Sequence, residues 1–296
     1  MISHLYFFDD LTHHLVRVVR EKAVGHELGA EVARMSREYA AELIACLDGA
    51  VQDCTLVPWE HAVEQLAWLL QGRPGRYDLI IGQGANGESA LRSLDEAYSA
   101  RTGTRVAQHL ENVRIARFLS DPQDPFHSDF ELRTTVGLSV AERCSEMVAK
   151  LPADRASRVA VFDDCIQTGK GTGHVVDAVR TALTDSGREA TVDTLSLIGC
   201  GQTLDHFSAQ GVDSVTAVML RGQTYPESWD WDVYFLKDFF LPNAIRFTDG
   251  TQHAYVEDEA WMARVFGGNP ERAILCIKRM RAELAELGLL DALLEM

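Results

Sequence analysis

The stretch RVAVFDDCIQTGKGT, from Arg158 to Thr172, carries several structural signals in immediate succession. The apolar run Val159–Phe162 has the length of a short buried strand, and it ends at two adjacent carboxylates, Asp163 and Asp164. A turn rich in threonine and glycine follows. Beyond the turn, apolar residues recur at helical spacing: Val175, Val176, Val179 and Leu183. The stretch therefore predicts a strand, an acidic tip, a turn and the N-terminus of a helix.

This order of elements suits a ligand that carries both hydroxyl groups and a phosphate, such as a ribose 5-phosphate. Backbone N–H groups in the turn and the helix dipole favour the phosphate. The carboxylates of Asp163 and Asp164 can accept hydrogen bonds from sugar hydroxyls. Two neighbouring carboxylates repel one another, and they gain nothing unless a ligand, metal or other cation meets them. The alternative is an ordinary surface turn with incidental acids.

The segment resembles the ribose-phosphate signature of the type I phosphoribosyltransferase family. That signature has an apolar strand, two acidic residues, three variable residues and then Thr-Gly-x-Thr. Asp163 and Asp164 match the acidic pair. The resemblance implies that the following loop binds the 5-phosphate, and its residues here are Thr168, Gly169, Lys170, Gly171 and Thr172. One departure is that the second threonine, Thr172, comes one residue later than in the family's pattern.

A second segment supports the first. Tyr77–Gly82 is another short apolar run, and it is followed by glycine-rich sequence and a helical stretch. In phosphoribosyltransferases the first core strand leads into a short loop that binds pyrophosphate through backbone amides. Ala85, Asn86 and Gly87 occupy the matching place by resemblance. Small residues suit this task, because the backbone must approach a dense anion closely.

The same loop allows a different interpretation. Gly82–Gly87 formally matches G-x-G-x-x-G between a strand and a helix, which is the fingerprint of dinucleotide-binding proteins. An NAD(P)-dependent oxidoreductase of this type also needs an acidic residue about twenty positions later, at the end of a second strand. Glu111 is the candidate, although no clean apolar strand precedes it. This alternative leaves the acidic tip and its turn unexplained.

Composition excludes several classes of protein. The chain has 296 residues and a formal net charge of −16, from 28 basic and 44 acidic residues. A surface for nucleic acid would be basic, and an acidic chain is equally unsuited to an anionic membrane. No stretch approaches the ~20 apolar residues of a membrane span. The six cysteines are scattered without metal-binding spacing, which favours reduced thiols in the cytoplasm.

The chain divides into three expected parts. Residues 1–73 are mostly helical in pattern, and Gly72-Arg73-Pro74-Gly75 forms a break. Residues 74–224 alternate strands and helices, which predicts parallel βαβ units. Residues 225–296 form an aromatic-rich and helical C-terminal extension. We expect an α/β fold with a parallel twisted sheet, like that of type I phosphoribosyltransferases. The expected strands are Leu79–Ile81, about 113–118, Val159–Phe162, Leu195–Gly199 and Val215–Leu220.

Two other segments are candidates for ligand contacts. In the resembling family a mobile loop supplies cations to pyrophosphate, and the candidates here are Arg114, Arg117 and Arg133. The aromatic segment around Trp229, Trp231 and Tyr234 either stacks on a flat acceptor or anchors the C-terminal extension. The last helix has an apolar stripe, which suits packing within the chain or contact with a second subunit.

The resemblance implies transfer of ribose 5-phosphate from 5-phosphoribosyl 1-pyrophosphate to a small-molecule acceptor, with Mg²⁺ and with release of pyrophosphate. We expect Asp163 and Asp164 to be the catalytic carboxylates that hold the ribose hydroxyls and Mg²⁺. Gln167 stands where enzymes for 6-oxopurines commonly have an aspartate, so a plain hypoxanthine–guanine enzyme is disfavoured. The acceptor stays open, a homodimer is expected, and the alternative is a non-catalytic regulator that binds phosphoribosyl pyrophosphate.

Overall fold

The computed structural model describes eleven stretches of the chain: residues 4–21, 26–47, 53–73, 76–120, 130–134, 137–221, 231–240, 244–246, 248, 252–267 and 270–291. They form two compact units. One unit contains residues 61–118 and 130–225, and we call it the central unit. The other contains residues 1–60, 119–129 and 226–296, and we call it the terminal unit. Both units combine parallel strands with helices, so the expected α/β class is confirmed.

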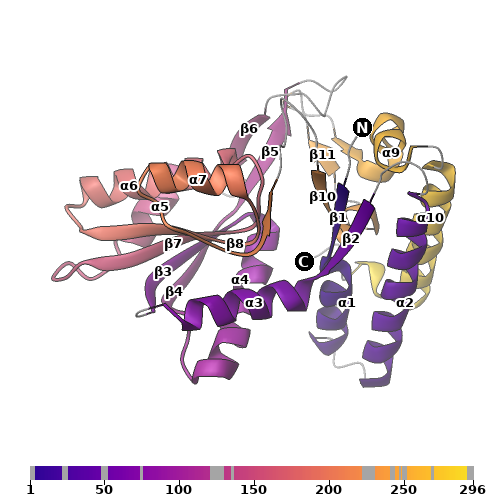
Figure 1. The fold of residues 1–296 in the computed structure, drawn as a ribbon, viewed down its shortest axis with the longest axis horizontal. Coiled ribbons are helices and arrows are strands. Elements are labelled where there is room, and N and C mark those ends of the chain that lie inside the picture. The colour runs from indigo at the N-terminus through magenta and orange to yellow at the C-terminus, as the bar shows by residue number, and fades with distance from the viewer. Residues whose placement is uncertain are drawn as a thin grey trace. The chain divides into compact units, whose positions relative to one another are not determined.

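The central unit is built on a five-stranded sheet in the order β4-β3-β7-β8-β9. Figure 1 labels β3, β4, β7 and β8 of this sheet. Every neighbouring pair in this sheet is parallel. Four of the strands contain the expected strands, and the fifth, β4, ends at the beginning of the segment expected about 113–118. The strands are β3 (Tyr77–Gln83), β4 (Ala107–Val113), β7 (Ser157–Ile166), β8 (Ala190–Cys200) and β9 (Ser214–Leu220).

Helices cover the sheet of the central unit: α5, α6 and α7 lie on one side, and α4 lies on the other (Figure 1). Their bounds are α4 (Gly84–Thr102), α5 (Val140–Val148), α6 (Lys170–Asp185) and α7 (Gly201–Ala209). Alternate residues of a strand point to opposite faces. Leu79, Ile81, Val159 and Val161 accordingly share one buried cluster with the apolar stripes of α5 and α6. Ser139 caps α5 through a reciprocal contact with Glu142.

The strand expected about 113–118 is divided in the structure. β4 ends at Val113, and β5 (Ile115–Leu119) pairs with β6 (Phe130–Thr134) in a separate two-stranded sheet. Residues 121–129, which lie in the sequence between the candidate residues Arg117 and Arg133, are outside the described residues.

The terminal unit has a parallel sheet of its own, in the order β10-β1-β2. Its strands are β1 (His4–Asp9), β2 (Asp53–Pro58) and β10 (Trp231–Phe235). α3 (Trp59–Gln71) follows β2, and its last eleven residues belong to the central unit. The other elements are α1 (Asp10–Glu21), α2 (His26–Ala45), α8 (Leu236–Phe240), β11 (Ala244–Arg246), β12 (Gln252–Ala254), the 3₁₀ turn η1 (Tyr255–Glu257), α9 (Glu259–Phe266) and α10 (Pro270–Glu286).

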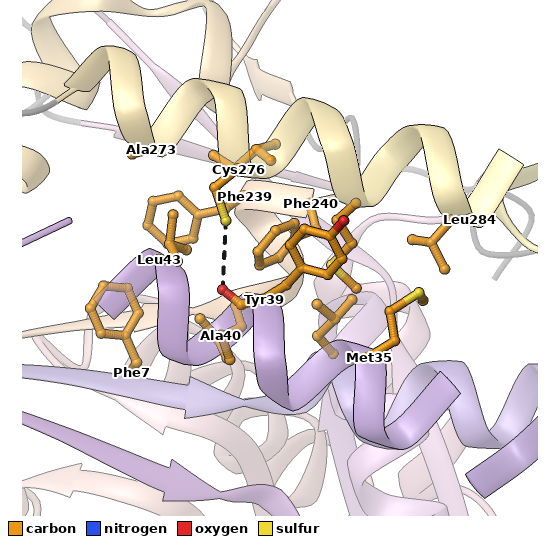
Figure 2. Close-up of a cluster of buried hydrophobic side chains, with 14 of the residues drawn as sticks. Phe7, Met35, Tyr39, Ala40, Leu43, Phe239, Phe240, Ala273, Cys276 and Leu284 are labelled. Atoms are coloured by element: carbon orange, nitrogen blue, oxygen red, sulfur yellow. Dashed lines mark hydrogen bonds between the residues drawn. The ribbon is translucent and has the colours of Figure 1, made fainter. Parts of the chain in front are cut away.

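Side chains from both ends of the chain fill the core of the terminal unit. Figure 2 shows Phe7 of β1, Leu43 of α2, Phe239 of α8 and Cys276 of α10 in one cluster. All four are fully buried. Burial of each large apolar side chain stabilises the fold by about 1.5–3 kcal/mol. The apolar stripe of the last helix therefore packs inside its own unit.

The arrangement differs from the three consecutive parts expected from the sequence. Residues 1–60 and 226–296 share one sheet and one core, and they include strands as well as helices. The reason is that β1 pairs with β10, whose residues lie more than two hundred positions later. Local periodicity cannot show such a pairing. Among the described residues, no helix combines the length and the hydropathy that a membrane span requires.

Candidate active site

The strand order of the central unit has a switch point at β3. β3 lies between β4 and β7, so the connections that leave β3 and β4 run in opposite directions across the sheet. In open parallel sheets, ligands bind outside the carboxyl ends of the strands at such a switch point. Gly82 pairs in register with Phe162. The next residues of the two strands, Gln83 and Asp163, are therefore neighbours in the sheet.

Asp163 is held by protein donors. Its Oδ2 accepts a hydrogen bond from Gln83 Nε2 and another, of 3.1 Å, from Thr172 Oγ1. Gln83 Nε2 also donates to Thr172 Oγ1 at 2.9 Å. Burial, and then the charge of Asp164, raise the pKa of Asp163 well above the ordinary value of an aspartate. The side chain is therefore fixed inside the sheet edge and is not a mobile surface acid.

Asp164 has a different environment. It is the next residue of β7, and its charge is close enough to raise the pKa of Asp163. The residue is buried, and its Oδ2 has no hydrogen-bond partner among the described residues. A buried carboxylate oxygen without a partner is costly unless a ligand or ion meets it. Asp164 is thus the acid that most needs an additional partner.

The acidic pair fits Mg²⁺ by its chemistry. Mg²⁺ prefers oxygen ligands and is commonly bound through one or two carboxylates together with substrate phosphates. Among the described residues, no group of three or more His, Cys, Asp or Glu side chains could hold a metal by itself. A metal at Asp163 and Asp164 would therefore need oxygens from the ligand as well.

The turn after β7 is shaped by Gly169. This residue has a φ of 73° and precedes α6, whose first residue is Lys170. A Cβ at position 169 would lie 2.5 Å from Thr203 Cγ2. The first helical hydrogen bond runs from Gly173 N–H to Gly169 C=O at 2.7 Å, so N–H groups of the turn before it have no helical acceptor. N–H groups at a helix N-terminus are donors that suit an anion, and the one of Lys170 lies 3.4 Å from Thr168 Oγ1 in this structure.

The residues of the expected phosphate loop do not share one environment. Thr168 and Lys170 are exposed, whereas Thr172 is 1% exposed. Because α6 already begins at Lys170, Thr172 is its third residue and faces β7. The Thr172 hydroxyl donates to Asp163, so it is not directed at the turn that is expected to bind phosphate. This is the structural consequence of the late threonine in the sequence.

The expected pyrophosphate loop is the first turn of α4. β3 ends at Gln83, and α4 begins at Gly84 with a φ of 72°. Ala85, Asn86 and Gly87 therefore contribute backbone N–H groups at a helix N-terminus. A Cβ at position 82 would lie 3.1 Å from the Gly87 oxygen, so only glycine allows this close approach. Asn112 Nδ2 donates to the Gly84 oxygen at 2.9 Å and fixes the turn.

The three candidate arginines lie in different surroundings. Arg117 is close enough for its charge to oppose the rise in the pKa of Asp163. Arg114 forms an ion pair with Glu88 at 3.0 Å. Arg133 forms an ion pair with Glu131 and lies 4.8 Å from the centroid of the Phe118 ring. Of the three, Arg117 is therefore the one that the structure relates to the acidic pair.

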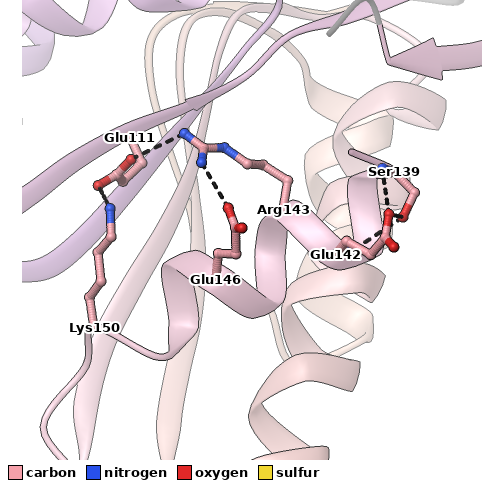
Figure 3. A network of polar contacts seen from close by, with 6 residues as sticks. All are labelled: Glu111, Ser139, Glu142, Arg143, Glu146 and Lys150. Atoms are coloured by element: carbon pink, nitrogen blue, oxygen red, sulfur yellow. Dashed lines mark hydrogen bonds and ion pairs between the residues drawn. The ribbon is translucent and has the colours of Figure 1, made fainter. Parts of the chain in front are cut away.

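The acid needed for a dinucleotide site is engaged elsewhere. Glu111 lies within β4, opposite Ile81, and contacts both Arg143, at 3.7 Å, and Lys150 (Figure 3). In the dinucleotide fold the corresponding carboxylate is offered to a ribose at the end of its strand. The geometry of Glu111 therefore does not support the oxidoreductase alternative.

A cavity of about 700 Å³ flanks β4 and α4. Two of the arginines that line it are paired with neighbouring acids: Arg105 with Asp95 at 3.0 Å, and Arg114 with Glu88. Neither Asp163 nor Asp164 lines it. The cavity therefore does not include the acidic pair, although Asn112, which fixes the turn at Gly84, is one of its lining residues.

The aromatic segment mainly supports the anchoring interpretation. The Tyr234 ring lies 6.1 Å from that of Phe7 and 5.9 Å from that of Phe239, within the terminal unit. Trp229 and the side chain of Trp231 lie outside the described residues.

Sequence reasoning missed Gln83. A signal for it exists, because Leu79, Ile81 and Gln83 alternate along β3 in the same way as Val159, Val161 and Asp163 along β7. Both series point to the face covered by α6. The contact becomes predictable once β3 and β7 are known to be neighbours in register.

No protein-family model and no curated protein matches the chain. Several solved structures are similar to it. A hypothetical protein from Neisseria gonorrhoeae with bound ppGpp is 14% identical, with 60% of this chain and 82% of that chain covered and a TM-score of 0.39. The purine phosphoribosyltransferase from Pyrococcus horikoshii is 15% identical (59% and 85% covered, TM-score 0.32).

The adenine phosphoribosyltransferase from Thermoanaerobacter pseudethanolicus is 16% identical, with 55% of this chain and 80% of that chain covered and a TM-score of 0.30. Two of these three structures are phosphoribosyltransferases. These likenesses are distant, with TM-scores below 0.5, so a function for the chain has to rest on its own residues.

Proposed function

We propose that the protein is a phosphoribosyltransferase that uses 5-phosphoribosyl 1-pyrophosphate and Mg²⁺. The observation that carries the proposal is the buried Asp164 Oδ2, without a partner among the described residues, at a switch point between two helix N-termini. One N-terminus, of α6, suits a 5-phosphate, and the other, of α4, suits pyrophosphate. An acidic pair between two anion sites matches a ligand with ribose hydroxyls between two phosphate groups.

In this mechanism the chain positions the substrate and stabilises charge. The turn at Gly169 and the first turn of α6 hold the 5-phosphate. The acidic pair of Asp163 and Asp164 provides the acceptor for the ribose hydroxyls, and the N–H groups at Ala85–Gly87 hold pyrophosphate. When bound at the acidic pair, Mg²⁺ offsets negative charge on the leaving group. The acceptor attacks C1 of the ribose while the bond from C1 to the pyrophosphate oxygen breaks.

The acceptor is a small molecule, and residue 167 does not act as the base that removes its proton. Gln167 cannot act as a base at neutral pH, and its backbone oxygen accepts a hydrogen bond of 2.6 Å from Thr203 Oγ1. We therefore place the protein outside the plain hypoxanthine–guanine enzymes. The acceptor is another nucleobase or heterocycle, an amine or a hydroxyl compound.

Thermal unfolding with added ligands tests the proposal. Separate samples receive phosphoribosyl pyrophosphate with Mg²⁺, NAD, or ATP. A ligand at ~100 times its dissociation constant stabilises the folded state by about 2.7 kcal/mol, which raises the melting temperature by several degrees. We expect a shift with phosphoribosyl pyrophosphate and Mg²⁺, and none in the double variant Asp163→Asn/Asp164→Asn.

Two outcomes would redirect the proposal. A shift with NAD that persists in the double variant would favour the dinucleotide alternative. A shift with phosphoribosyl pyrophosphate, but no pyrophosphate release with any acceptor of a nucleobase, amine and alcohol panel, would favour a non-catalytic regulator.

A further inference from the structure

The two carboxylates of the acidic tip are not equivalent in the structure. Asp163 lies beneath α6, and its Oδ2 already accepts two hydrogen bonds, from Gln83 and Thr172. Asp164 is the next residue along β7, and its Oδ2 has no partner among the described residues. Two acids that look interchangeable in the sequence therefore have different capacity for a ligand.

Gln83 is the residue that creates this difference. It ends β3, and its amide nitrogen reaches across to β7 and α6 by donating to Asp163 and, at 2.9 Å, to Thr172 Oγ1. Asp163, Thr172 and Gln83 are each buried, with exposures of 6%, 1% and 6%. One amide therefore joins the strand before the expected pyrophosphate site to the strand and helix of the expected ribose-phosphate site.

The side-chain oxygen of Gln83 is a second possible contact for the ligand. Gln83 Oε1 is buried and has no hydrogen-bond partner among the described residues. A Cβ at position 171 would lie 3.8 Å from this oxygen, so Oε1 is next to the first turn of α6. An acceptor left without a partner beside an anion site suits a hydroxyl group of the ligand.

We propose that Gln83 and Thr172 are positioning residues that hold Asp163, and that Asp164 is the carboxylate that contacts the ligand directly. The last residues paired in register between the two strands are Gly82 and Phe162, and the Gln83–Asp163 contact links β3 and β7 one residue beyond them, on the side of the two expected anion sites. This inference rests on the proposed function and refines the role of each acid within it.

Affinity for phosphoribosyl pyrophosphate in saturating Mg²⁺, measured by titration calorimetry, tests the inference. Gln83→Met keeps the size of the side chain but removes the donor. We expect it to weaken binding about tenfold, the cost of one hydrogen bond to a charged group. Asp163→Asn should cost a similar factor, because an asparagine side chain at this position can still accept from Gln83, whereas Asp164→Asn should cost about a hundredfold or more.

A double-variant cycle separates positioning from general loss of structure. If Gln83 acts through Asp163, the variant Gln83→Met/Asp163→Asn binds no more weakly than the weaker single variant. Thr172→Val should weaken binding, and Thr172→Ser, which keeps the hydroxyl, should restore it. The matched control is Thr194→Val, which removes the buried contact of 2.7 Å between Thr194 and Ser214 in the same sheet. Thr194→Val should leave the affinity unchanged. The double variant Gln83→Met/Thr194→Val should then bind as weakly as Gln83→Met alone.

Three results would each overturn the inference while the proposed function stands. They are equal losses of affinity in Asp163→Asn and Asp164→Asn, wild-type affinity in Gln83→Met, and a loss in Gln83→Met/Asp163→Asn that is the product of the two single losses. Absence of binding by the wild-type protein would overturn the proposed function and this inference together.

Discussion

The two units of the molecule contain the same three residues at the end of a central parallel strand. Phe8-Asp9-Asp10 ends β1 and begins α1, and Phe162-Asp163-Asp164 lies near the end of β7. In both sheets the strand has neighbours on each side. The difference is in the connection to the next helix: α1 begins at Asp10 itself, whereas residues 167–169 form a turn before α6.

The carboxylates of the two tips also differ in their hydrogen-bond and ion-pair partners. In the terminal unit Asp9 accepts hydrogen bonds of 3.1 Å from both the N–H and the hydroxyl of Thr12. Asp10 accepts from the N–H of Lys237 at 3.0 Å and lies 3.9 Å from its ammonium group. These acids bind the strand to its own helices, and Asp10 Oδ2 meets the Lys237 ammonium group as an ion pair rather than through a hydrogen bond, whereas Asp164 Oδ2 has no hydrogen-bond partner among the described residues. The partners of the carboxylates, and not the acidic pair itself, therefore distinguish a structural tip from a candidate site.

Removal of a charge from the terminal unit should have the largest effect on stability. Asp10 is fully buried and Lys237 nearly so. Asp10→Ala leaves a buried ammonium group without its carboxylate, which costs about 3–5 kcal/mol. We expect this loss in the free energy of unfolding measured with urea. Asp164→Ala should cost far less, because it removes a carboxylate that is poorly satisfied in the absence of ligand.

The double variant Asp10→Ala/Lys237→Met is the control for this comparison. Because it removes both charges, much of the lost stability should return. Equal destabilisation by Asp10→Ala and Asp164→Ala would contradict the distinction between the two tips.

Acid should weaken the terminal unit through its histidines. Burial, and then the charges of Arg17, Arg20 and Lys237, lower the pKa of His13 to about 4. His14 is shifted in the same direction, chiefly by burial. The unfolded chain, with a histidine pKa near 6.5, binds the proton first as the pH falls. Stability should therefore drop between about pH 6.5 and pH 4, by about 3 kcal/mol for His13.

Urea unfolding at several pH values, in the wild type and in His13→Gln, measures this effect. The variant should show a shallower loss of stability across that window. The same slope in both proteins would show that His13 is not the group that titrates.

The comparison also explains how much the sequence can predict. The strand, turn and helix around Asp163 follow from local patterns, and Gly169 from the need for a turn. The strand β1 was not expected, because its partners β2 and β10 come from distant parts of the chain. The Gln83–Asp163 contact needs the register of β3 and β7, and the inward direction of Thr172 needs the helix to begin at Lys170. Local patterns thus identify the acidic tip of the site but not the partners of its acids.

A pair of glycine variants tests the turn before α6, residues 167–169, which has no counterpart between β1 and α1. Gly169→Ala forces a side chain into a left-handed backbone conformation and against Thr203, and we expect a loss of about 2 kcal/mol or more together with a loss of ligand response. Gly171→Ala is the matched control, since its Cβ would have an ordinary contact of 3.8 Å with Gln83 Oε1. It lies in the first turn of α6, where alanine is a better helix former than glycine. A larger loss of stability in Gly171→Ala than in Gly169→Ala would contradict this account of the turn.

The smallest effect concerns Asp9, whose carboxylate caps α1 through Thr12. Loss of such a cap costs about 1 kcal/mol, so Asp9→Ala should lower the free energy of unfolding by that amount. Asp9→Asn should cost less, because asparagine caps helices as well as aspartate does. Burial also raises the pKa of Asp9, and a neutral amide avoids the cost of that buried charge. Neither variant should alter the thermal shift with phosphoribosyl pyrophosphate, and a loss of that shift in Asp9→Asn would give the acidic tip of the terminal unit a part in ligand binding.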